Sequence, residues 1–322
     1  MRELNYLQAI REAQFEEMKR DPKVFIMGED ITYSIYGTTA GFLEEFGAER
    51  VRNTPISESG FTGVGIGAAL VGMRPIVDYS IASFIFVAMD QLVSMAAKAT
   101  YMYGGQAKVP IVFRAVMFYG GGNAAQHSDR PYPSLMNVPG LKIIMPATPY
   151  DMKGLLKSAI RDDDPVFCFE DGTVLSSTGP VPEEEYLVPI GIGDIKREGT
   201  DVTIVGIAGC VALALQAAEA LAQEGISAEV IDPRTLVPMD KNIILESVSK
   251  TGRLVVADPA HKTCSAASQV AAIVAEEGFW SLHAPIQVVA TADVQIPFSP
   301  TLEQQVYPTK EKIVEAVHKT MA

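Results

Sequence analysis

The spacing of apolar residues along the first half of the chain predicts helices and strands in alternation. Residues 3–20 carry apolar side chains at the spacing of an amphipathic helix. Short apolar runs that end in glycine or acidic residues are typical of buried parallel strands. Strands that alternate with helices predict a parallel sheet with helices on both faces, which is an α/β fold. Strands are expected at 24–30, 74–79, 110–116, 141–148 and 165–171, and further helices at 60–72, 88–103 and 150–161.

A second α/β domain is expected after a change in composition. Residues 176–200 are rich in proline, glycine and acidic residues and have no helical stripe, so we interpret them as a linker. Beyond the linker, apolar strands and helices alternate again to the last residue. The pattern therefore predicts a larger domain over 1–175 and a smaller one over 201–322.

Charge and cysteine content narrow the class of protein. The 322 residues carry a formal net charge of −13, which disfavours nucleic-acid and anionic-membrane surfaces because both require clusters of lysine and arginine. The three cysteines lie far apart without metal-binding spacing, which indicates reduced thiols. No apolar run reaches the roughly 20 residues of a membrane helix, and no signal peptide is evident. A cytoplasmic protein that binds neither nucleic acid nor membrane is expected.

The stretch RNTPISESGFTGVGIGAALVG, residues 52–72, allows more than one interpretation. Glycines that open a helix are typical of dinucleotide-binding loops, and Asp78 lies near the position of the ribose-binding acid in such loops. However, Glu58 stands just before the glycines, and its charge would repel a pyrophosphate. An acid here can also interact simply with the dipole and first N–H groups of a helix. If this stretch does not bind a dinucleotide, its glycines instead allow the helix to pack closely against a neighbouring backbone.

Seven motifs in order resemble the β subunits of thiamine-diphosphate-dependent 2-oxoacid and acetoin dehydrogenases, the first and decarboxylating component of those complexes. The likeness spans nearly the whole chain, so it is more specific than any one motif. It implies a transketolase-like fold, with a pyrimidine-binding domain followed by a smaller C-terminal α/β domain. The motifs are GED (28–30), NTPISESGFTGVGIGAALVGMRPI (53–76), DQLVSMAAKATYMYGGQAKVPIVFR (90–114), AAQHSD (124–129), PGLKIIMPATPYDMKGLLKSAIRDDDPV (139–166), EVIDPRTLVPMD (229–240) and TGRLVV (251–256).

The resemblance implies that the first domain binds the aminopyrimidine of thiamine diphosphate. It gives Glu58 a catalytic role: a carboxyl group on the pyrimidine nitrogen drives the tautomer that removes the thiazolium proton. Phe84 matches an aromatic residue that packs against the pyrimidine, and we interpret Phe86 as core. Ile56 and Ser80 complete the implied cofactor-binding set. Ser80 replaces a larger side chain that family members often carry.

The loop around His127 is implied to form the substrate end of the site. The family's matching histidine faces the reacting carbon, where imidazole can handle protons near neutral pH; a surface histidine is the alternative. Asp129 and Arg130 begin a loop, residues 129–135, that departs from the family pattern. Arg130 could pair with a carboxylate, but a solvated loop arginine is the commoner case. The substrate therefore stays open among pyruvate, branched-chain oxoacids and acetoin.

The resemblance also implies ions and partner chains. Ala159, Ile160 and Asp162 match a segment whose oxygen atoms hold potassium; a capped helix end with solvated acids is the alternative. The chain lacks the GDG and asparagine arrangement that holds Mg²⁺ and diphosphate in this superfamily. An α subunit is therefore expected to supply those ligands, in a heterotetramer of two α and two β subunits. A lipoyl acyltransferase is the expected acceptor of the acyl unit.

Three other functions remain possible from the sequence. The altered loop suggests a biosynthetic enzyme that transfers a ketol or acyl unit without a lipoyl complex. A non-catalytic homologous subunit is disfavoured because Glu58, Phe84 and His127 are all present. A stand-alone NAD-binding protein is the weakest alternative, because of the charge on Glu58.

Overall fold

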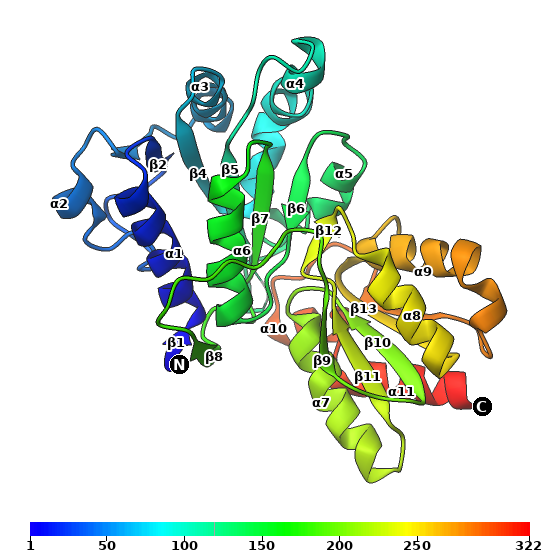
Figure 1. The fold of residues 1–322 in the computed structure, drawn as a ribbon. Coiled ribbons are helices and arrows are strands. Elements are labelled where there is room, and N and C mark those ends of the chain that lie inside the picture. The colour runs from blue at the N-terminus through cyan, green and yellow to red at the C-terminus, as the bar shows by residue number, and fades with distance from the viewer. Residues whose placement is uncertain (119) are drawn as a thin grey trace. The chain divides into compact units, whose positions relative to one another are not determined.

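The computed structural model describes residues 1–118 and 120–322, which fall into two compact units (Figure 1). The first unit comprises Met1–Phe118 and Ser134–Ile190. The second comprises residues 120–133 and Gly191–Ala322. The chain thus contributes a short segment to the second unit and then returns to the first, an arrangement that the change in composition does not reveal.

A parallel sheet forms the centre of the first unit (Figure 1). Its strands follow the order β6-β7-β5-β4-β2-β3, and each neighbouring pair in this order is parallel. The predicted parallel sheet is therefore confirmed. The strands are β2 (Val24–Gly28), β3 (Val51–Asn53), β4 (Arg74–Ile81), β5 (Val112–Met117), β6 (Lys142–Ile144) and β7 (Val166–Asp171).

Helices cover both faces of this sheet because successive strand residues point to opposite sides. Helices α1 (Tyr6–Arg20) and α6 (Pro149–Arg161) pack together over a core that includes Ile76 of β4. The next residue, Val77, points to the other face and meets α3 (Glu58–Leu70). The α/β layering expected from the sequence is thus present in this unit.

The first residues of the expected N-terminal helix form a strand instead. β1 (Arg2–Asn5) pairs antiparallel with β8 (Thr178–Val181), and α1 begins only at Tyr6. The side chain of Asn5 accepts a hydrogen bond from the Gln8 amide, and the Gln8 side chain accepts one from the Asn5 amide. This reciprocal capping fixes the start of the helix. The short helices elsewhere are α2 (Phe42–Phe46) and α5 (Tyr132–Met136).

The helix predicted over 88–103 is not one regular α-helix. A 3₁₀ helix, Ala82–Ala88, precedes a π-helical turn, Gln91–Ala96, and only Ala99–Met102 (α4) is α-helical. The apolar spacing is helical, but over so few residues it does not distinguish the wider π turn from an α-helix. Gly104 follows with a φ of 63°, which only glycine adopts readily, and ends the segment as expected.

A smaller sheet forms the second unit, in the order β14-β13-β10-β11-β9, with β9 antiparallel to β11 and the other pairs parallel. Val202 and Ile204 lie in a core with α7 and α11, whereas Thr203 between them bonds Ser247 and Thr251 of α8. The second predicted α/β domain is therefore present. Its elements are β9 (Asp194–Arg197), β10 (Val202–Gly206), α7 (Cys210–Gln223), β11 (Ala228–Asp232), β12 (Thr235–Val237), α8 (Lys241–Thr251), β13 (Leu254–His261), α9 (Ala266–Glu277), β14 (Gln287–Thr291), α10 (Pro300–Val306) and α11 (Lys310–Met321).

The stretch predicted as a linker carries strands of both units. β8 belongs to the first unit through β1, and β9 belongs to the second through β11. Between them, the Ser158 hydroxyl on α6 donates a hydrogen bond of 2.6 Å to the Val188 carbonyl. The change from one unit to the other thus occurs at Gly191, within the predicted 176–200.

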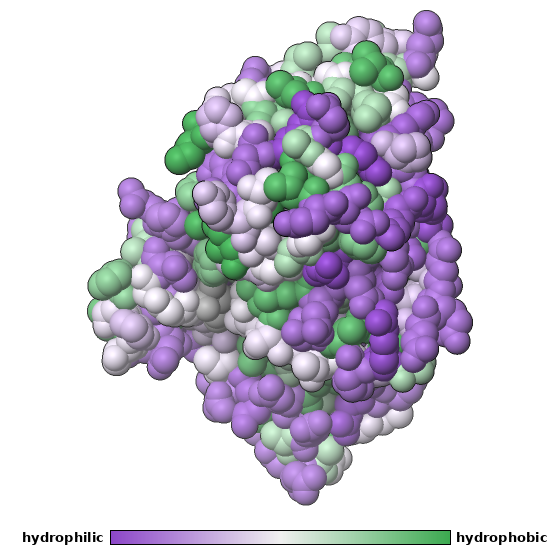
Figure 2. All heavy atoms as spheres, turned by 90° about the vertical axis from the view of Figure 1, so that its left-hand side faces the viewer, coloured by the Kyte–Doolittle hydropathy of each residue, from purple (hydrophilic) through white to green (hydrophobic). Residues whose placement is uncertain are grey.

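The helices, the surface and the cysteines give the following picture. None of the helices in the described ranges is long and apolar enough to cross a membrane. On the face drawn in Figure 2, hydrophilic side chains surround separate apolar areas. Cys168, Cys210 and Cys264 are all free thiols.

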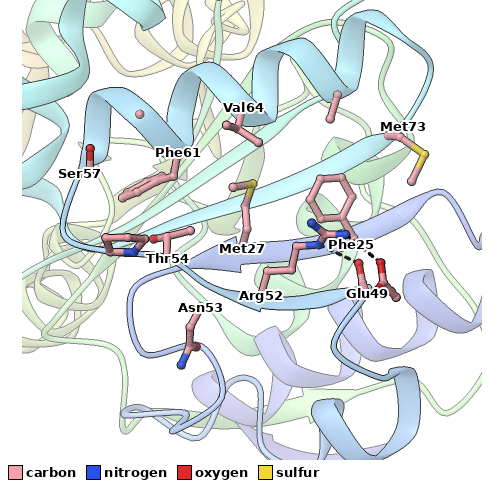
Figure 3. Close-up of a pocket in the computed structure, with 13 residues that line it drawn as sticks. Phe25, Met27, Glu49, Arg52, Asn53, Thr54, Ser57, Phe61, Val64 and Met73 are labelled. Atoms are coloured by element: carbon pink, nitrogen blue, oxygen red, sulfur yellow. Dashed lines mark hydrogen bonds and ion pairs between the residues drawn. The ribbon is translucent and has the colours of Figure 1, made fainter.

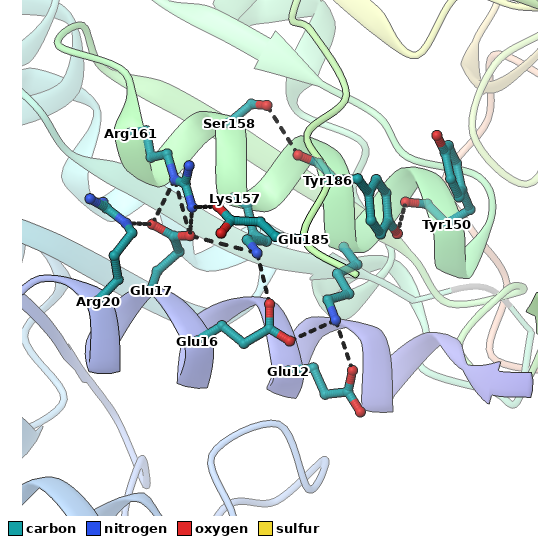
Figure 4. A network of polar contacts seen from close by, with 12 residues as sticks. Glu12, Glu16, Glu17, Arg20, Tyr150, Lys157, Ser158, Arg161, Glu185 and Tyr186 are labelled. Atoms are coloured by element: carbon teal, nitrogen blue, oxygen red, sulfur yellow. Dashed lines mark hydrogen bonds and ion pairs between the residues drawn. The ribbon is translucent and has the colours of Figure 1, made fainter. Parts of the chain in front are cut away.

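Two buried lysines join α6 to the acidic face of α1 (Figure 4). Lys153 and Lys157 are only 1% and 2% exposed. Lys153 Nζ lies 3.0 Å from Glu12 Oε2 and 2.7 Å from Glu16 Oε1, and Lys157 Nζ lies 2.7 Å from Glu16 Oε2. A buried ammonium group is strongly unfavourable without a carboxylate partner. Glu16, which contacts both lysines, is therefore central to the packing of the two helices.

We expect Glu16→Gln to lower the free energy of unfolding by about 1 kcal/mol at pH 7, since water partly screens Glu16. Partial burial raises the pKa of Glu16, but hydrogen bonds from Lys153 and Lys157 outweigh it and lower the pKa below its ordinary value of 4.5. The stabilisation is then complete above that value and is lost as the pH falls through the lowered pKa. Urea unfolding of both proteins at several pH values measures this difference.

The matched control is Glu45→Gln, which removes an exposed pair with Lys19, at 2.8 Å and with both side chains more than 40% exposed. It should change stability by less than about 0.5 kcal/mol. Equal effects of the two substitutions, or a Glu16 effect that does not decrease as the pH falls below 4.5, would contradict the assignment.

Candidate active site

Glu58 is a buried acid at the start of a helix. It is the first residue of α3 and is 7% exposed. In the described part of the chain no group donates a hydrogen bond to its carboxylate, and the preceding Ser57 provides no side-chain cap. The first amides of a helix and its dipole favour negative charge at this position. A nearly buried carboxylate with spare acceptor capacity is suited to a polar group of a ligand.

A second carboxyl group, Glu29, lies beside the first. It follows the last residue of β2, and its atom Oε1 is buried with no hydrogen-bond partner among the described residues. Burial raises the pKa of Glu29, and the negative charges of Glu58 and Asp30 raise it further. Repulsion between neighbouring negative charges makes Glu29 retain its proton more readily than an exposed acid.

Close packing of α3 on the sheet determines where Glu58 lies. A side chain at Gly65 would place its Cβ 2.8 Å from Val77 Cγ2 and 3.2 Å from Ile111 Cδ1. Gly63 and Gly67 have no such neighbours and lie on the exposed side of the helix. Close packing, the expected reason for these glycines, is therefore confirmed at Gly65.

The predicted cofactor residue Ser80 is held by a buried ionic cluster. Ser80 has a φ of 60°, and its amide donates to Asp78 Oδ1 at 2.8 Å. Asp78 Oδ2 in turn accepts from Arg114 Nη1 at 3.0 Å, and Arg114, 2% exposed, also bonds Glu170 at 2.7 Å and Gln14 at 2.8 Å. Burial raises the pKa of Glu170 to about 7, against the opposing charge of Arg114. Asp78 is thus committed to the protein, which argues against the ribose-binding alternative.

The two phenylalanines after β4, Phe84 and Phe86, differ in their exposure. Phe84 is half-buried, but Phe86 is 46% exposed, so its interpretation as core is wrong. This segment is a 3₁₀ helix, in which residues three apart share a face. The buried apolar positions are accordingly Ala82, Ile85 and Ala88. Ile56, predicted to bind the cofactor, precedes α3 and is 83% exposed.

A cavity of about 570 Å³ lies beside α3, between this helix and strands β2 and β3 (Figure 3). Phe61 and Val64 reach it from α3 and Met27 from β2. The ion pair between Arg52 and Glu49, at 3.1 Å, also lines it. Neither Glu58 nor Glu29 is among its lining residues. This hollow is therefore distinct from the carboxyl pair, and the sequence did not predict it.

The predicted substrate residues belong to the second unit. His127 ends a single 3₁₀ turn, Ala125–His127, and is half-buried. Asp129 is also half-buried. Arg130 is 7% exposed, and its guanidinium lies over the ring of Tyr307, 4.9 Å from the ring centre. Arg130 is therefore not a solvated loop arginine. The attraction between its guanidinium and the face of the Tyr307 ring compensates in part for the loss of water.

The atoms predicted to hold potassium come together but are already engaged. The Ala159 carbonyl accepts from the Asp162 amide at 3.2 Å. Arg74 donates to the carbonyls of Ile160 at 3.1 Å and of Asp162 at 2.8 Å. Lys142 Nζ lies 2.8 Å from both carboxylate oxygens of Asp162. Two cationic side chains, Arg74 and Lys142, thus already contact oxygen atoms predicted to bind potassium. This arrangement fits a further cation poorly, and the potassium site stays a prediction.

Sequence reasoning missed Glu29 as a possible member of the site. It appeared only as part of the motif GED. The available signal was its position, because the carboxyl end of a parallel strand and the start of the following helix lie at the same edge of an α/β sheet. Glu29 after β2 and Glu58 at the start of α3 satisfy that rule.

Comparison with protein families agrees with the division of the chain. Residues 2–174 match the family described as transketolase, pyrimidine binding domain. Residues 191–313 match the transketolase C-terminal domain. A solved structure described as a split gene transketolase, inactive beta4 tetramer, superposes with a TM-score of 0.80 at 27% sequence identity, covering 98% of this chain and 97% of that one. The predicted transketolase-like fold is thus confirmed.

Similar curated proteins cover almost the whole chain. The 2-oxoisovalerate dehydrogenase subunit beta of Bacillus subtilis is 45% identical over 98% of both chains. The acetoin:2,6-dichlorophenolindophenol oxidoreductase subunit beta of the same organism is 44% identical over 95% of this chain and 94% of that protein. The pyruvate dehydrogenase E1 component subunit beta of Rickettsia felis is 44% identical over 97% and 96%. With the two family matches, this likeness establishes that the chain belongs to the transketolase-like β subunits of 2-oxoacid and acetoin dehydrogenases.

Proposed function

We propose that this chain is the β subunit of a thiamine-diphosphate-dependent 2-oxoacid or acetoin dehydrogenase and that Glu58 activates the cofactor. The observation that carries the proposal is the buried carboxylate of Glu58 at the start of α3, beside Glu29. A structural acid at a helix N-terminus is usually solvated, because burial costs it more than the dipole returns. Here the carboxylate is buried and retains acceptor capacity.

The residues present fit an aminopyrimidine ring. Glu58 offers a carboxylate for the ring nitrogen, and Glu29 Oε1 is a buried acceptor without a partner in the described structure. Phe84 offers an aromatic face that is half-buried, and Ser80 is held by Asp78. When bound, thiamine diphosphate supplies a carbon nucleophile for the substrate carbonyl and accepts the electrons of the broken carbon–carbon bond.

In this proposal Glu58 holds a proton between its carboxylate and the ring nitrogen of the pyrimidine. The proton stabilises the imino form of the ring, which is the form able to act as a base. Glu29 assists because its carboxyl group lies close enough to Glu58 for the two negative charges to repel each other. The ionic cluster around Arg114 keeps Ser80 in position beside this site.

His127 acts on the substrate in the same proposal. Its imidazole hydrogen-bonds the substrate oxygen or carboxylate and transfers a proton as the charge on the substrate changes. Asp129 and Arg130 flank it and shape the substrate loop. The stacking of Arg130 on Tyr307 makes its role one of holding the loop rather than of meeting a substrate carboxylate freely.

The proposal requires partner chains. An α subunit would provide the ligands for Mg²⁺ and the diphosphate, in a heterotetramer of two α and two β subunits. A lipoyl acyltransferase would accept the acyl unit, in the cytoplasm. The exposed side of α3, with Gly63, Val64 and Gly67, is open to a neighbouring chain. The names of the relatives, which are β subunits, support the need for an α-type partner.

The experiment that tests the function uses the complex of this chain with its α-type partner. Initial rates are measured with thiamine diphosphate, Mg²⁺ and an artificial electron acceptor on pyruvate, a branched-chain 2-oxoacid and acetoin. Cofactor-dependent turnover of one of them supports the proposal and identifies the substrate. A stable complex that binds the cofactor but oxidises none of them favours a transfer reaction without a lipoyl complex. Absence of cofactor binding favours a non-catalytic subunit.

We expect Glu58→Gln to reduce cofactor-dependent turnover by at least about 100-fold, because an amide can hydrogen-bond the ring but cannot carry the proton. The melting temperature of the apoprotein should not fall, since the substitution removes a buried charge beside Glu29. If Glu58 served only to interact with the helix dipole, its neutralisation would instead lower the free energy of unfolding by about 0.3–1 kcal/mol. Initial rates and thermal unfolding separate the two roles.

Glu44→Gln is the matched control, because Glu44 is an exposed acid in the first turn of α2. It should leave turnover unchanged. If Glu58→Gln retains wild-type turnover with bound cofactor, Glu58 does not activate the pyrimidine.

We expect His127→Gln to lower kcat about 100-fold or more, while the affinity for thiamine diphosphate changes little. The reason is that His127 is proposed to act on the substrate and not on the cofactor. Steady-state kinetics and a cofactor titration measure the two effects, with exposed His283→Gln as the control. A parallel loss of cofactor affinity would argue against this division of roles.

A further inference from the structure

The segment that carries His127 has little regular structure of its own. Apart from the 3₁₀ turn Ala125–His127, residues 120–131 form neither helix nor strand. Ala124 has a φ of 56°, which is unfavourable for a residue with a side chain, and Gly122 has a φ of 73°. Such a segment keeps one conformation only when its surroundings enforce it. The contacts that enforce it therefore determine where His127 lies.

One attachment follows His127 in the sequence. Tyr132 is fully buried, and its hydroxyl donates a hydrogen bond to Asp258 Oδ1 of β13. The same hydroxyl accepts a hydrogen bond of 3.1 Å from the Ala260 amide. Asp258, also fully buried, accepts further bonds from the amides of Ala260 at 2.9 Å and of Ala267 at 2.8 Å. Burial and the neighbouring Asp258 raise the pKa of Tyr132, so this hydroxyl remains a donor.

A second attachment encloses the segment from both ends. Glu303 of α10 is 1% exposed, and its Oε2 accepts a hydrogen bond of 3.0 Å from the Gly122 amide, before His127. Its Oε1 accepts from the Tyr307 hydroxyl at 3.3 Å. That hydroxyl lies 3.5 Å from Arg130 Nη1, and the Arg130 guanidinium stacks on the same ring. One buried carboxylate thus contacts the chain directly before His127 and, through Tyr307, after it.

These attachments differ from surface contacts because both carboxylates are buried. Burying a carboxylate costs several kcal/mol unless hydrogen bonds compensate it. Asp258 and Glu303 both use backbone amides and a tyrosine hydroxyl for that purpose. All of these groups belong to the second unit, as does His127.

We propose that Asp258, through Tyr132, and Glu303, through Gly122 and Tyr307, are positioning residues that hold His127 in its working place. The inference rests on the proposed role of His127 at the substrate. Neither carboxylate needs to touch the substrate or the cofactor. Their task is to keep the His127 turn in one conformation, so that loss of either hydrogen-bond set misplaces the imidazole.

The test uses Tyr132→Phe, which deletes one hydroxyl, and Glu303→Gln, which weakens the second attachment. Tyr6→Phe is the matched control, because Tyr6 is equally buried and donates one hydrogen bond, of 2.8 Å, to the Pro146 carbonyl in the first unit. In the loaded complex we expect each test variant to lower kcat about 10- to 100-fold, the range expected for a catalytic group displaced by about 1 Å. The KM and the cofactor affinity should change less than threefold, and the control should not change.

A double substitution shows whether the effect passes through His127. If Tyr132 acts only by placing His127, Tyr132→Phe should cost little in a protein that already carries His127→Gln. Additive losses would mean that Tyr132 acts independently, and would overturn the proposal. Glu303→Gln is treated in the same way, so that a folding defect in one variant still leaves a test.

A second readout does not depend on activity. The full chain has four histidines, so its labelled histidine Cε1–H signals are few, and His127→Gln identifies the relevant one. Tyr132→Phe and Glu303→Gln should shift or broaden the His127 signal, whereas Tyr6→Phe should not. An unchanged signal in both variants refutes the positioning role even if the complex is active. A changed signal in a complex without turnover upholds the positioning and rejects only the proposed function.

Discussion

The close approach of α3 to the parallel sheet is the constraint on which the position of Glu58 depends. Only a residue without a side chain at position 65 lets the helix lie on Val77 and Ile111. With the helix at that distance, Glu58 at its first turn is buried beside Glu29 at the end of β2. A carboxylate that would be solvated at most helix starts is thus held almost out of contact with water. The packing of α3 on Val77 and Ile111 thus also determines where the two acids lie.

The two units hold the residues proposed to act in the site by different physical means. In the first unit, regular elements do so: a strand end, a helix start and a 3₁₀ helix present Glu29, Glu58 and Phe84. In the second unit, His127 lies on an irregular segment, and buried carboxylates take the place of regular hydrogen bonding. An irregular segment is free to vary in sequence as long as its attachments persist. This explains how residues 129–135 can depart from the family pattern while the neighbouring His127 matches it.

The layered α/β fold could be predicted from the sequence because apolar spacing reports directly on burial. The pattern failed where burial does not follow the period: the π-helical turn after residue 90 and the exposed Phe86 both arise from helices with other than 3.6 residues per turn. Glu58 and His127 could be singled out from motifs. The burial of Arg130 could not, because Tyr307 lies 177 residues away and no local pattern connects them. Lys153 and Lys157 were likewise hidden, since lysines on a helix are normally solvated.

The attachment of Gly122 to Glu303 has a consequence for how the protein forms during synthesis. The two residues are separated by 181 positions, and the acid lies close to the C-terminal end of the chain. While the chain emerges from the ribosome, the central sheet of the first unit can assemble long before α10 exists. Until α10 has been synthesised, the segment that carries His127 lacks its hydrogen bond from Gly122 to Glu303. A nascent or C-terminally truncated chain would therefore be well folded in its larger part, while the segment that carries His127 would still lack its attachment to Glu303.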